Sequence, residues 1–333
     1  MLRLGIIGCG RVTTMFHLNA IEEVKGVTVT AVSDVSGERM RDVLGRCASA
    51  KAYTNYAELL DDPAVDAVAV NTPPRFHEEM VLESLSHGKH VLCEKPLAQT
   101  VEGCNRIGEA QRKTGLQVLP AHNYAFTPSV LRMAEMLKGG AVGEVQRVRV
   151  HFENNLRVYR SQTDFRTHQE NGLVEDVLPH VLSVSAPMAG RVRDVRDLSW
   201  WCRQYEVCDN IRATLNAEGG AEIDCSMSWT RLVPRFEVEV EGTQGRLETD
   251  LMIGPYSVTV EKGGRRETIK ERGLDWYLDL VRFKHPSFQG QYRHFAGLVA
   301  GTEEPMITVE DEAAMLGIME RVSGLLKETP RSR

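Results

Sequence analysis

The stretch "GIIGCGRVTTMFHLNAI" at residues 5–21 decides the fold. It places Gly8-x-Gly10-x-x-Thr13 between an apolar, strand-like run and an amphipathic segment of helical length. One glycine permits a tight turn out of the strand, and the second lets another group approach the backbone closely. The helix that follows would direct its amides and positive dipole end at an anion. The pattern therefore predicts a site for the pyrophosphate of a dinucleotide, with Arg11 and Val12 among its contacts.

An acidic residue follows at the spacing that a dinucleotide site requires. Asp34 ends the second apolar run, about 24 residues beyond Gly10. There its carboxylate can accept hydrogen bonds from ribose hydroxyls and would repel a 2′-phosphate, which favours NAD over NADP. Thr13 replaces the third glycine of the pattern, which predicts looser packing of helix on strand. The alternative is that Gly8 and Gly10 only shape a turn and that Asp34 caps the next helix.

Residues 2–121 alternate between continuously apolar runs and amphipathic segments. Continuously apolar runs predict buried strands at 2–8, 27–34, 65–71, 90–93 and 117–121. Amphipathic segments between them predict helices at 12–22, 38–48, 76–87 and 101–113. Strand and helix in alternation imply right-handed crossovers and a doubly wound parallel sheet.

After residue 122 the pattern changes to alternating apolar and polar residues. Strands are predicted at 145–152, 210–217, 221–228, 236–241, 246–250 and 257–261, with helices at 129–137, 292–300 and 309–327. Glycine-containing turns join several of them, which indicates one large antiparallel sheet. A chain of 333 residues favours two domains. We therefore expect an α/β protein with a dinucleotide-binding domain at 1–121 and a second, α+β domain at 122–333.

Composition excludes several classes of protein. The net charge of −6 and the lack of a long basic run argue against nucleic acid or an anionic membrane as partner. No apolar stretch approaches the roughly 18 residues of a membrane span, so we expect a cytoplasmic protein. The seven cysteines show no zinc-site spacing and are expected to be reduced thiols, and no metal is expected.

A second informative stretch is "HGKHVLCEKPLAQT" at residues 87–100. Lys95 follows the fourth predicted strand, at the carboxyl edge where doubly wound sheets bind ligands. Pro96 disfavours helical geometry at Lys95, so its side chain can be aimed at a ligand. The alternative is an exposed lysine in a loop.

With residues 71–100 ("NTPPRFHEEMVLESLSHGKHVLCEKPLAQT"), 122–128 ("HNYAFTP"), 172–180 ("GLVEDVLPH") and 241–250 ("EGTQGRLETD"), the sequence resembles the Gfo/Idh/MocA oxidoreductases. The resemblance implies an N-terminal Rossmann domain, a C-terminal domain built on an open antiparallel sheet, and pyridine-nucleotide chemistry on sugars or cyclitols. Ala125 departs from the family, which often has arginine there, and "GLVED" is bulkier than the usual glycine-rich run. Both departures leave the particular substrate open.

The resemblance also implies roles for individual residues. Lys95 would lie between nicotinamide and substrate, His180 would take the hydroxyl proton, and Asp176 would stabilise the resulting imidazolium. The alternative is that Asp176 caps a helix with Pro179 in its first turn. Further cofactor contacts are expected at Asn71, Thr72, Pro73, His77, Glu94 and Lys95, and substrate contacts at Lys95, Asn123, Arg166, Asp176 and His180.

Several residues keep two interpretations. His77 is equally consistent with a surface position, and His17 either reaches the cofactor or packs between helix and sheet. Arg157, Arg160, Arg166 and His168 form either an anion site or a solvated loop.

Three functions remain open at this stage. The first is an NAD(H)-dependent oxidoreductase for a secondary alcohol or ketone of a sugar, cyclitol or related polyol. The second is a redox-neutral hydrolase or lyase that uses transient oxidation, and the third is a non-catalytic nucleotide-binding sensor. A homodimer or homotetramer is expected through the exposed face of the C-terminal sheet.

Overall fold

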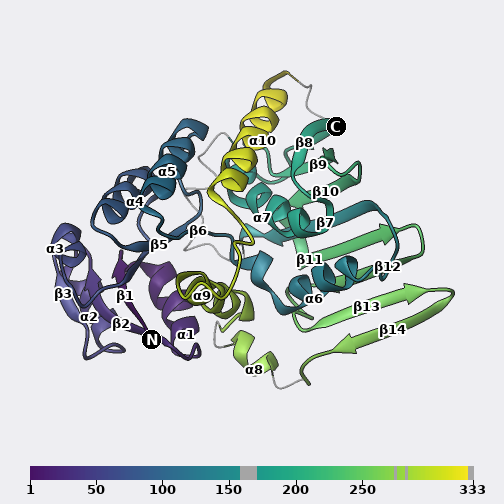
Figure 1. Ribbon diagram of the computed structural model, residues 1–333. Helices are drawn as coiled ribbons and strands as arrows, with labels where there is room; N and C mark the ends of the chain where they lie inside the picture. The colour runs from purple at the N-terminus through teal and green to yellow at the C-terminus, as the bar shows by residue number, and fades with distance from the viewer. Residues whose placement is uncertain (158–170, 274–275, 282–283, 329–333) are drawn as a thin grey trace. The chain divides into compact units, whose positions relative to one another are not determined.

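The computed structural model describes residues 1–157, 171–273, 276–281 and 284–328 (Figure 1). The chain forms two compact units. The first unit comprises Met1–Phe126 and Leu274–Ala313, and the second comprises Thr127–Gly273 and Ala314–Arg333. Each unit is built around one sheet and is described separately below.

The first unit contains the predicted doubly wound parallel sheet. Its six strands lie in the order β3-β2-β1-β4-β5-β6, with β1 Leu2–Ile7, β2 Val27–Ser33, β3 Lys51–Tyr53, β4 Ala67–Val70, β5 His90–Glu94 and β6 Val118–Ala121. Leu4, Ile6, Val68 and Leu92 are fully buried, as expected of strands covered on both faces. The carboxyl ends of all six strands lie at one edge, and the chain reverses its direction of winding between β1 and β4.

Helical elements of the first unit connect these strands or follow the last of them. They are η1 Thr13–His17, α1 Leu18–Ile21, α2 Gly37–Leu44, α3 Tyr56–Leu60, η2 Pro74–Phe76, α4 His77–Ser86, α5 Val101–Thr114, η3 Asn123–Phe126, α8 Trp276–Val281 and α9 Pro286–Val299. The predicted first helix begins as the π-helix η1. The three-residue strand β3 and the five-residue helix α3 were not predicted, because both are too short to show a hydrophobic period.

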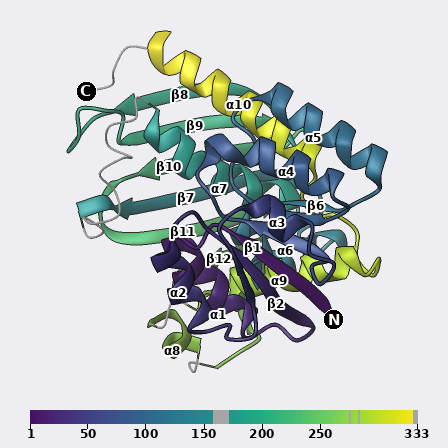
Figure 2. The same cartoon turned by 90° about the vertical axis from the view of Figure 1, so that its left-hand side faces the viewer.

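The second unit contains an eight-stranded sheet in the order β14-β13-β12-β11-β7-β10-β9-β8. Figure 2 shows β8, β9, β10, β7 and β11 side by side. The strands are β7 Val145–Asn155, β8 Val192–Trp201, β9 Asn210–Ala217, β10 Glu222–Ser228, β11 Thr230–Gly242, β12 Gly245–Asp250, β13 Ser257–Lys262 and β14 Arg265–Lys270. The prediction of a wholly antiparallel sheet is wrong at one pair, because β7 and β10 run parallel. The sheet is therefore mixed.

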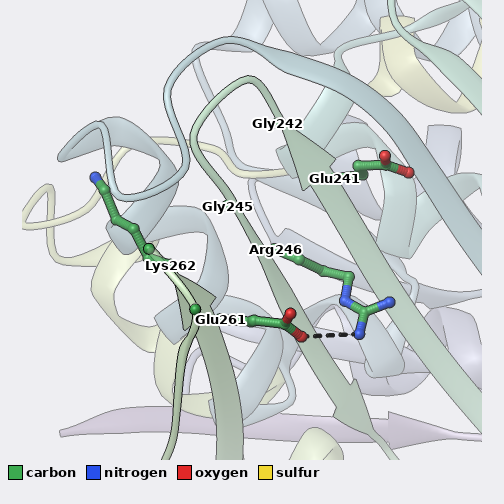
Figure 3. A pocket seen from close by; sticks show the side chains of 8 residues that line it. Glu241, Gly242, Gly245, Arg246, Glu261 and Lys262 are labelled. Carbon is green, nitrogen blue, oxygen red and sulfur yellow. Dashed lines mark hydrogen bonds and ion pairs between the residues drawn. The ribbon is translucent and has the colours of Figure 1, made fainter.

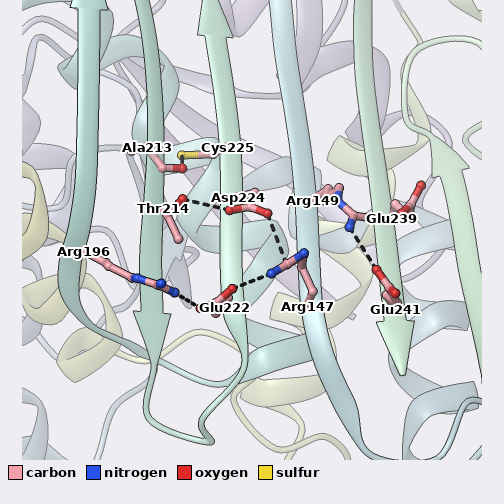
Figure 4. A network of polar contacts seen from close by, with 10 residues as sticks. All are labelled: Arg147, Arg149, Arg196, Ala213, Thr214, Glu222, Asp224, Cys225, Glu239 and Glu241. Carbon is pink, nitrogen blue, oxygen red and sulfur yellow. Dashed lines mark hydrogen bonds and ion pairs between the residues drawn. The ribbon is translucent and has the colours of Figure 1, made fainter. Parts of the chain in front are cut away.

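The two faces of this sheet differ in chemistry. Helix α7 (Gly172–Ala189) packs on β7 and β10, and α6 (Pro128–Lys138) packs on β12 and β13. Beneath α7, Phe152 stacks on Phe236 with ring centroids 4.3 Å apart. On the opposite, open face, charged side chains of neighbouring strands pair across the sheet (Figure 4). Arg147 binds Glu222 at 2.7 Å, and Arg149 binds Glu241 at 2.9 Å.

Helix α10 (Val309–Glu328) ends the described chain. Across the described ranges, none of the helices combines the length and apolar character needed to cross a membrane. The seven cysteines are free thiols, as expected, and five of them are buried.

Candidate active site

The carboxyl edge of the first unit's sheet carries a cavity of about 930 Å³. Loops that follow β1, β2, β3 and β4 line it, which is the switch point where doubly wound folds bind ligands. Eight of the predicted cofactor-binding residues line this cavity: Gly8, Gly10, Arg11, Val12, Asp34, Asn71, Thr72 and Pro73. The sheet thus brings together residues from widely separated parts of the sequence.

The two glycines of the first loop have different physical roles. Gly8 has φ +98°, and a Cβ atom there would lie 2.7 Å from the carbonyl oxygen of Asn71. Only glycine fits this turn without displacing the loop after β4. Gly10 has no atom within 4 Å of the corresponding position, although its residue lines the cavity. Its missing side chain therefore leaves room for a ligand to approach the backbone.

Thr13 joins the two loops by hydrogen bonds. Its buried hydroxyl donates to the carbonyl oxygen of Gly8 at 2.7 Å and accepts from Asn71 Nδ2 at 3.1 Å. The threonine thus ties the glycine loop to the loop after β4. Asn71 Oδ1 is buried without a hydrogen-bond partner among the described residues. Because a buried acceptor is costly when unpaired, this oxygen in the cavity wall fits a hydroxyl or amide donor of a dinucleotide.

Asp34 anchors the glycine loop. Its Oδ2 accepts the Cys9 amide at 2.8 Å, and its Oδ1 accepts the Ser36 amide at 2.8 Å. The alternative that Asp34 caps α2 is wrong, since the N-cap is Ser36, whose hydroxyl accepts the Arg39 amide. Each carboxylate oxygen can accept a further hydrogen bond, so Asp34 can also bind ribose hydroxyls.

Sequence reasoning missed several residues of the cavity wall. The cavity is also lined by residues for which no cofactor contact was predicted: Arg39, Thr54, Asn55, Tyr56, Arg75, Phe76, Glu79 and Met80. Val35 is 92% exposed beside the cavity, and Arg75 lies 4.5 Å from the centroid of the Phe76 ring. Exposed apolar surface of this kind suits a flat heterocycle. Only the unrecognised strand β3 would have drawn attention to residues 54–56.

Lys95 follows β5 at the same edge of the sheet and is half-buried. Its amide donates to Glu94 Oε2 at 3.2 Å. The other oxygen of Glu94 pairs with His17 Nε2 at 2.9 Å, and His17 Nδ1 lies 2.7 Å from the Tyr292 hydroxyl. Burial raises the pKa of Glu94, but the His17 hydrogen bond and nearby positive charges outweigh burial, so the pKa lies below its ordinary value. His17 is thus packed inside the unit, and Glu94 lies outside the cavity lining.

His77 is fully buried, so the surface position considered for it is wrong. Its Nδ1 lies 2.7 Å from the Pro96 carbonyl oxygen, and its Nε2 lies 2.7 Å from the Thr72 carbonyl oxygen. With both nitrogens used, His77 links the loops after β4 and β5 and lies outside the cavity lining.

In the second unit, Asp176 and His180 lie one turn apart on α7 and share a face. Helix α7 begins at Gly172 after the N-cap Asn171, so Asp176 lies beyond the first turn. The capping alternative for Asp176 is therefore wrong. His180 is half-buried, with its ring centroid 5.6 Å from that of Phe152.

Asn123 and Arg166 were also predicted to contact the substrate. Asn123 in the first unit is buried, and its Nδ2 donates to Ser287 Oγ at 2.8 Å, which ties η3 to α9. Its amide nitrogen is thus used inside the unit. Arg166 lies outside the described residues, as do Arg160 and His168.

Two further cavities lie on the second unit's sheet, and three of the four arginines that line them form ion pairs. One, of about 390 Å³, lies at the turns of β11, β12 and β13, where Arg246 binds Glu261 at 3.0 Å (Figure 3). The other, of about 410 Å³, lies on the open face, where Arg231 and Arg235 both bind Glu153. Neither cavity combines glycine-loop amides with an apolar wall as the first unit's cavity does.

Comparisons with known proteins agree with this geometry. The model of an oxidoreductase family with an NAD-binding Rossmann fold matches residues 2–122, and a GFO/IDH/MocA C-terminal domain model matches residues 130–248. The scyllo-inositol 2-dehydrogenase (NADP(+)) IolU of Bacillus subtilis is 26% identical over 275 residues, which span 81% of this chain and 82% of that protein.

Solved structures share the fold along nearly the whole chain. An oxidoreductase from Agrobacterium radiobacter in complex with NAD+, L-tartaric acid and magnesium gives a TM-score of 0.82 at 19% identity, covering 97% of this chain and 96% of the other. KijD10, a 3-ketoreductase from Actinomadura kijaniata in complex with NADP and TDP-benzene, gives 0.77 at 23% identity, covering 97% of each chain. With family models matching more than two thirds of its residues, the chain belongs to the Gfo/Idh/MocA family of NAD(P)-dependent oxidoreductases.

Proposed function

We propose that this protein transfers a hydride between NAD(H) and a secondary alcohol or ketone of a sugar, cyclitol or related polyol. The observation that carries the proposal is the cavity at the switch point of the parallel sheet. There Gly10 leaves the backbone open, and Asn71 offers an unsatisfied buried acceptor. Amides of the glycine loop would bind the pyrophosphate, and Asp34 would accept the adenosine ribose hydroxyls.

The proposed catalytic residues are Lys95, Asp176 and His180. Bound NAD supplies an electrophilic ring carbon that accepts the hydride. The Lys95 ammonium would hydrogen-bond the reacting oxygen and stabilise the charge that develops there. His180 would take the hydroxyl proton, and Asp176, one helical turn away, would stabilise the imidazolium. Thr72 and Pro73 would contact the cofactor along the cavity, while Glu94 and His77 would act through the loops that they hold.

The proposed cofactor preference is NAD over NADP. Asp34 places a carboxylate at the cavity, and that charge would repel a 2′-phosphate. Arg39 lines the same cavity and partly offsets this repulsion, so we expect NADP to bind more weakly without being excluded.

The substrate class rests on what relatives are said to use. One relative is a scyllo-inositol 2-dehydrogenase, another is a D-apiose dehydrogenase, and a structural neighbour is a 3-ketoreductase. The first two names specify polyhydroxylated compounds, and the third specifies reduction of a ketone. We therefore propose a polyhydroxylated substrate and leave its identity to a panel of polyols, ketosugars and sugar acids.

One assay tests the proposal directly. Purified protein is mixed with each member of the panel and NAD or NADH, and the absorbance band of the reduced nicotinamide is followed over time. A net oxidoreductase changes this band in proportion to product formed. Product without a net change would instead establish the redox-neutral hydrolase or lyase. Cofactor binding with no product from any member would favour the nucleotide-binding sensor.

We also propose that the second unit's open sheet face mediates association into a homodimer or a homotetramer. Arginine and glutamate residues alternate over this face, and a surface bearing both charges can complement a copy of itself across a twofold axis. Sedimentation at micromolar concentration should show a dimer or tetramer. A monomer under these conditions contradicts the proposal.

A further inference from the structure

The charged residues of strands β7 to β11 pair with one another almost completely, as Figure 4 shows in part. All five strands lie within the described residues. Across them, each arginine, aspartate and glutamate forms an ion pair within the chain, with two exceptions. The exceptions are Asp197 on β8 and Arg212 on β9, and both are exposed. One acid and one base of these strands are therefore left without a charged partner in the chain.

Asp197 and Arg212 are neighbours in the sheet that do not form an ion pair with each other. Asp197 lies directly opposite Thr214, and Arg212 comes two residues before Thr214 on the same strand. Such diagonal neighbours share a face, with Cα atoms roughly 7–8 Å apart. The Asp197 carboxylate accepts the Leu198 amide at 2.9 Å, and the Arg212 guanidinium carbon lies 5.4 Å from the centroid of the Trp201 ring. Neutral groups hold both side chains, so each charge is available to a group outside the chain.

Both residues line the cavity of about 410 Å³ on the open face. His151 lines it as well, and its Nδ1 is buried with no hydrogen-bond partner among the described residues. A buried polar atom is costly when it lacks a partner, so a donor or acceptor that entered the cavity and bound this nitrogen would be stabilising. The cavity therefore offers an anion, a cation and an unsatisfied nitrogen to whatever covers it.

Exposed apolar side chains lie next to this cavity in the sequence. Leu232 is 85% exposed and Val233 is 73% exposed. They lie between Arg231 and Arg235, which both line the cavity, in a part of β11 where the register against β7 is interrupted. Exposed apolar surface beside polar groups is typical of a surface that binds protein. These surroundings suit another protein surface better than a small polar ligand.

We propose that a second copy of this chain covers the cavity, and that Arg212 of each copy pairs with Asp197 of the other across a twofold axis. A twofold interface brings the same patch of both copies together, so that residue i meets residue j and j meets i. Asp197 and Arg212 carry opposite charges within one patch, as such an interface requires. The exposed Arg212 side chain would extend into the cavity of the other copy. This inference rests on the association proposed above and names the residues that carry it.

Reversal of either charge tests the pairing. Arg212→Asp would face Asp197 of the other copy with a second carboxylate, and Asp197→Arg would face Arg212 with a second guanidinium. Each like-charge contact occurs twice in a twofold assembly, so the dissociation constant should rise at least about a hundredfold in both variants, as measured by sedimentation. Arg132→Asp is the control. It changes the net charge equally on α6, which packs on the other face of the sheet, and should leave association unchanged.

Mixing the two reversed variants separates pairing between copies from any loss of folding. Alone, neither variant should associate. In a mixed pair, the aspartate introduced at position 212 faces the arginine introduced at position 197, and the unchanged Asp197 of the first variant faces the unchanged Arg212 of the second. Every contact again joins opposite charges, so an equimolar mixture should sediment as the wild type does. Pairing within one chain would not be restored by mixing.

Two milder variants keep the test open if a reversal prevents folding, which thermal unfolding shows. Arg212→Gln and Asp197→Asn remove one charge each and should raise the dissociation constant roughly tenfold. Wild-type association in the folded variants, or a mixture of folded reversed variants that stays dissociated, would overturn the inference and leave association through other residues standing. A monomeric wild type would instead remove the proposed association itself.

Discussion

The two sheets place their charged side chains in opposite ways. In the first unit, ionisable residues gather at the carboxyl edge in buried pairs such as His122 with Glu312. In the second unit, they cover the open face in partly exposed pairs, and the Arg147 and Glu222 side chains are 40% and 27% exposed. Buried pairs are costly to break and hold backbone in place, whereas exposed pairs contribute little each. The comparison separates an edge whose buried pairs hold backbone in place from a face whose exposed pairs are individually weak.

The largest effect is expected at the glycine loop. Gly8→Ala forces a Cβ atom to within 2.7 Å of the Asn71 carbonyl oxygen at φ +98°, so the loop must move. We expect NADH affinity to fall by at least about a hundredfold, together with a lower Tm. Titration of NADH fluorescence and thermal unfolding measure the two effects. In Gly10→Ala the added methyl group meets no protein atom within 4 Å, so NADH affinity should fall with little change in Tm. If Gly8→Ala bound NADH normally, the cavity would not be the cofactor site.

The contrast between buried and exposed ion pairs can be measured as the unfolding free energy that is lost when each pair is broken. His122→Ala leaves the Glu312 carboxylate buried without its partner and should cost about 3–5 kcal/mol of unfolding free energy. Arg196→Ala removes an ion pair with Glu222 on the open face, where the Arg196 side chain is 58% exposed. It should cost under about 1 kcal/mol. Urea unfolding of both variants decides the matter, and equal costs would remove the distinction drawn between the two sheets.

A smaller effect is expected at Arg39, which shares the cavity with Asp34. Arg39→Ala should weaken NADP(H) binding by roughly tenfold and leave NAD(H) nearly unchanged, because only the 2′-phosphate needs a cation. Arg41→Ala, on the same helix but outside the cavity, is the control. Dissociation constants for both cofactors test this. An equal loss of affinity for both cofactors would show that Arg39 holds the loop and does not bind the 2′-phosphate.

The smallest effect concerns acid stability at Asp62, a buried residue of the first unit. Hydrogen bonds from the Ala64 amide, Lys51 and Tyr53 lower the pKa of Asp62 to about 2. A lowered folded-state pKa stabilises the protein above the unfolded value of 3.8 and ceases to do so as the pH falls toward 2. Asp62→Asn should therefore cost about 1–2 kcal/mol near neutral pH, and the cost should shrink below about pH 4. A cost independent of pH would assign the effect to packing.

Sequence reasoning found the parts of the molecule that local patterns encode. Apolar runs located β1, β2, β4, β5 and β6, and the glycine spacing located the cavity, because both depend on neighbouring residues. The parallel pairing of β7 with β10 was missed, since pairing direction depends on how distant segments meet. Strand β8 was missed because its sequence, "VRDVRDLSWW", is largely polar outside its end.

The same division holds at the candidate site. Gly8, Gly10 and Asp34 follow from spacing, and Lys95 follows from its place after a strand. Glu312 follows from no local pattern, because its partners lie at positions 97 and 122. For His77, a cofactor contact and a surface position were both considered. The surface position is wrong, and only the fold shows that both ring nitrogens contact backbone carbonyl oxygens. The sequence alone does not reveal contacts between residues that lie far apart in the chain.

The central claim is that Lys95, at the edge of the first sheet, serves the reaction and not the binding of the cofactor. The most direct measurement compares wild type with Lys95→Ala for NADH affinity and for turnover of a panel substrate at saturating NAD, with Lys113→Ala on α5 as control. We predict that Lys95→Ala loses at least about a hundredfold in kcat while its NADH dissociation constant stays within about threefold, because the lost interaction forms in the transition state. A Lys95→Ala variant with turnover near that of wild type would contradict the account.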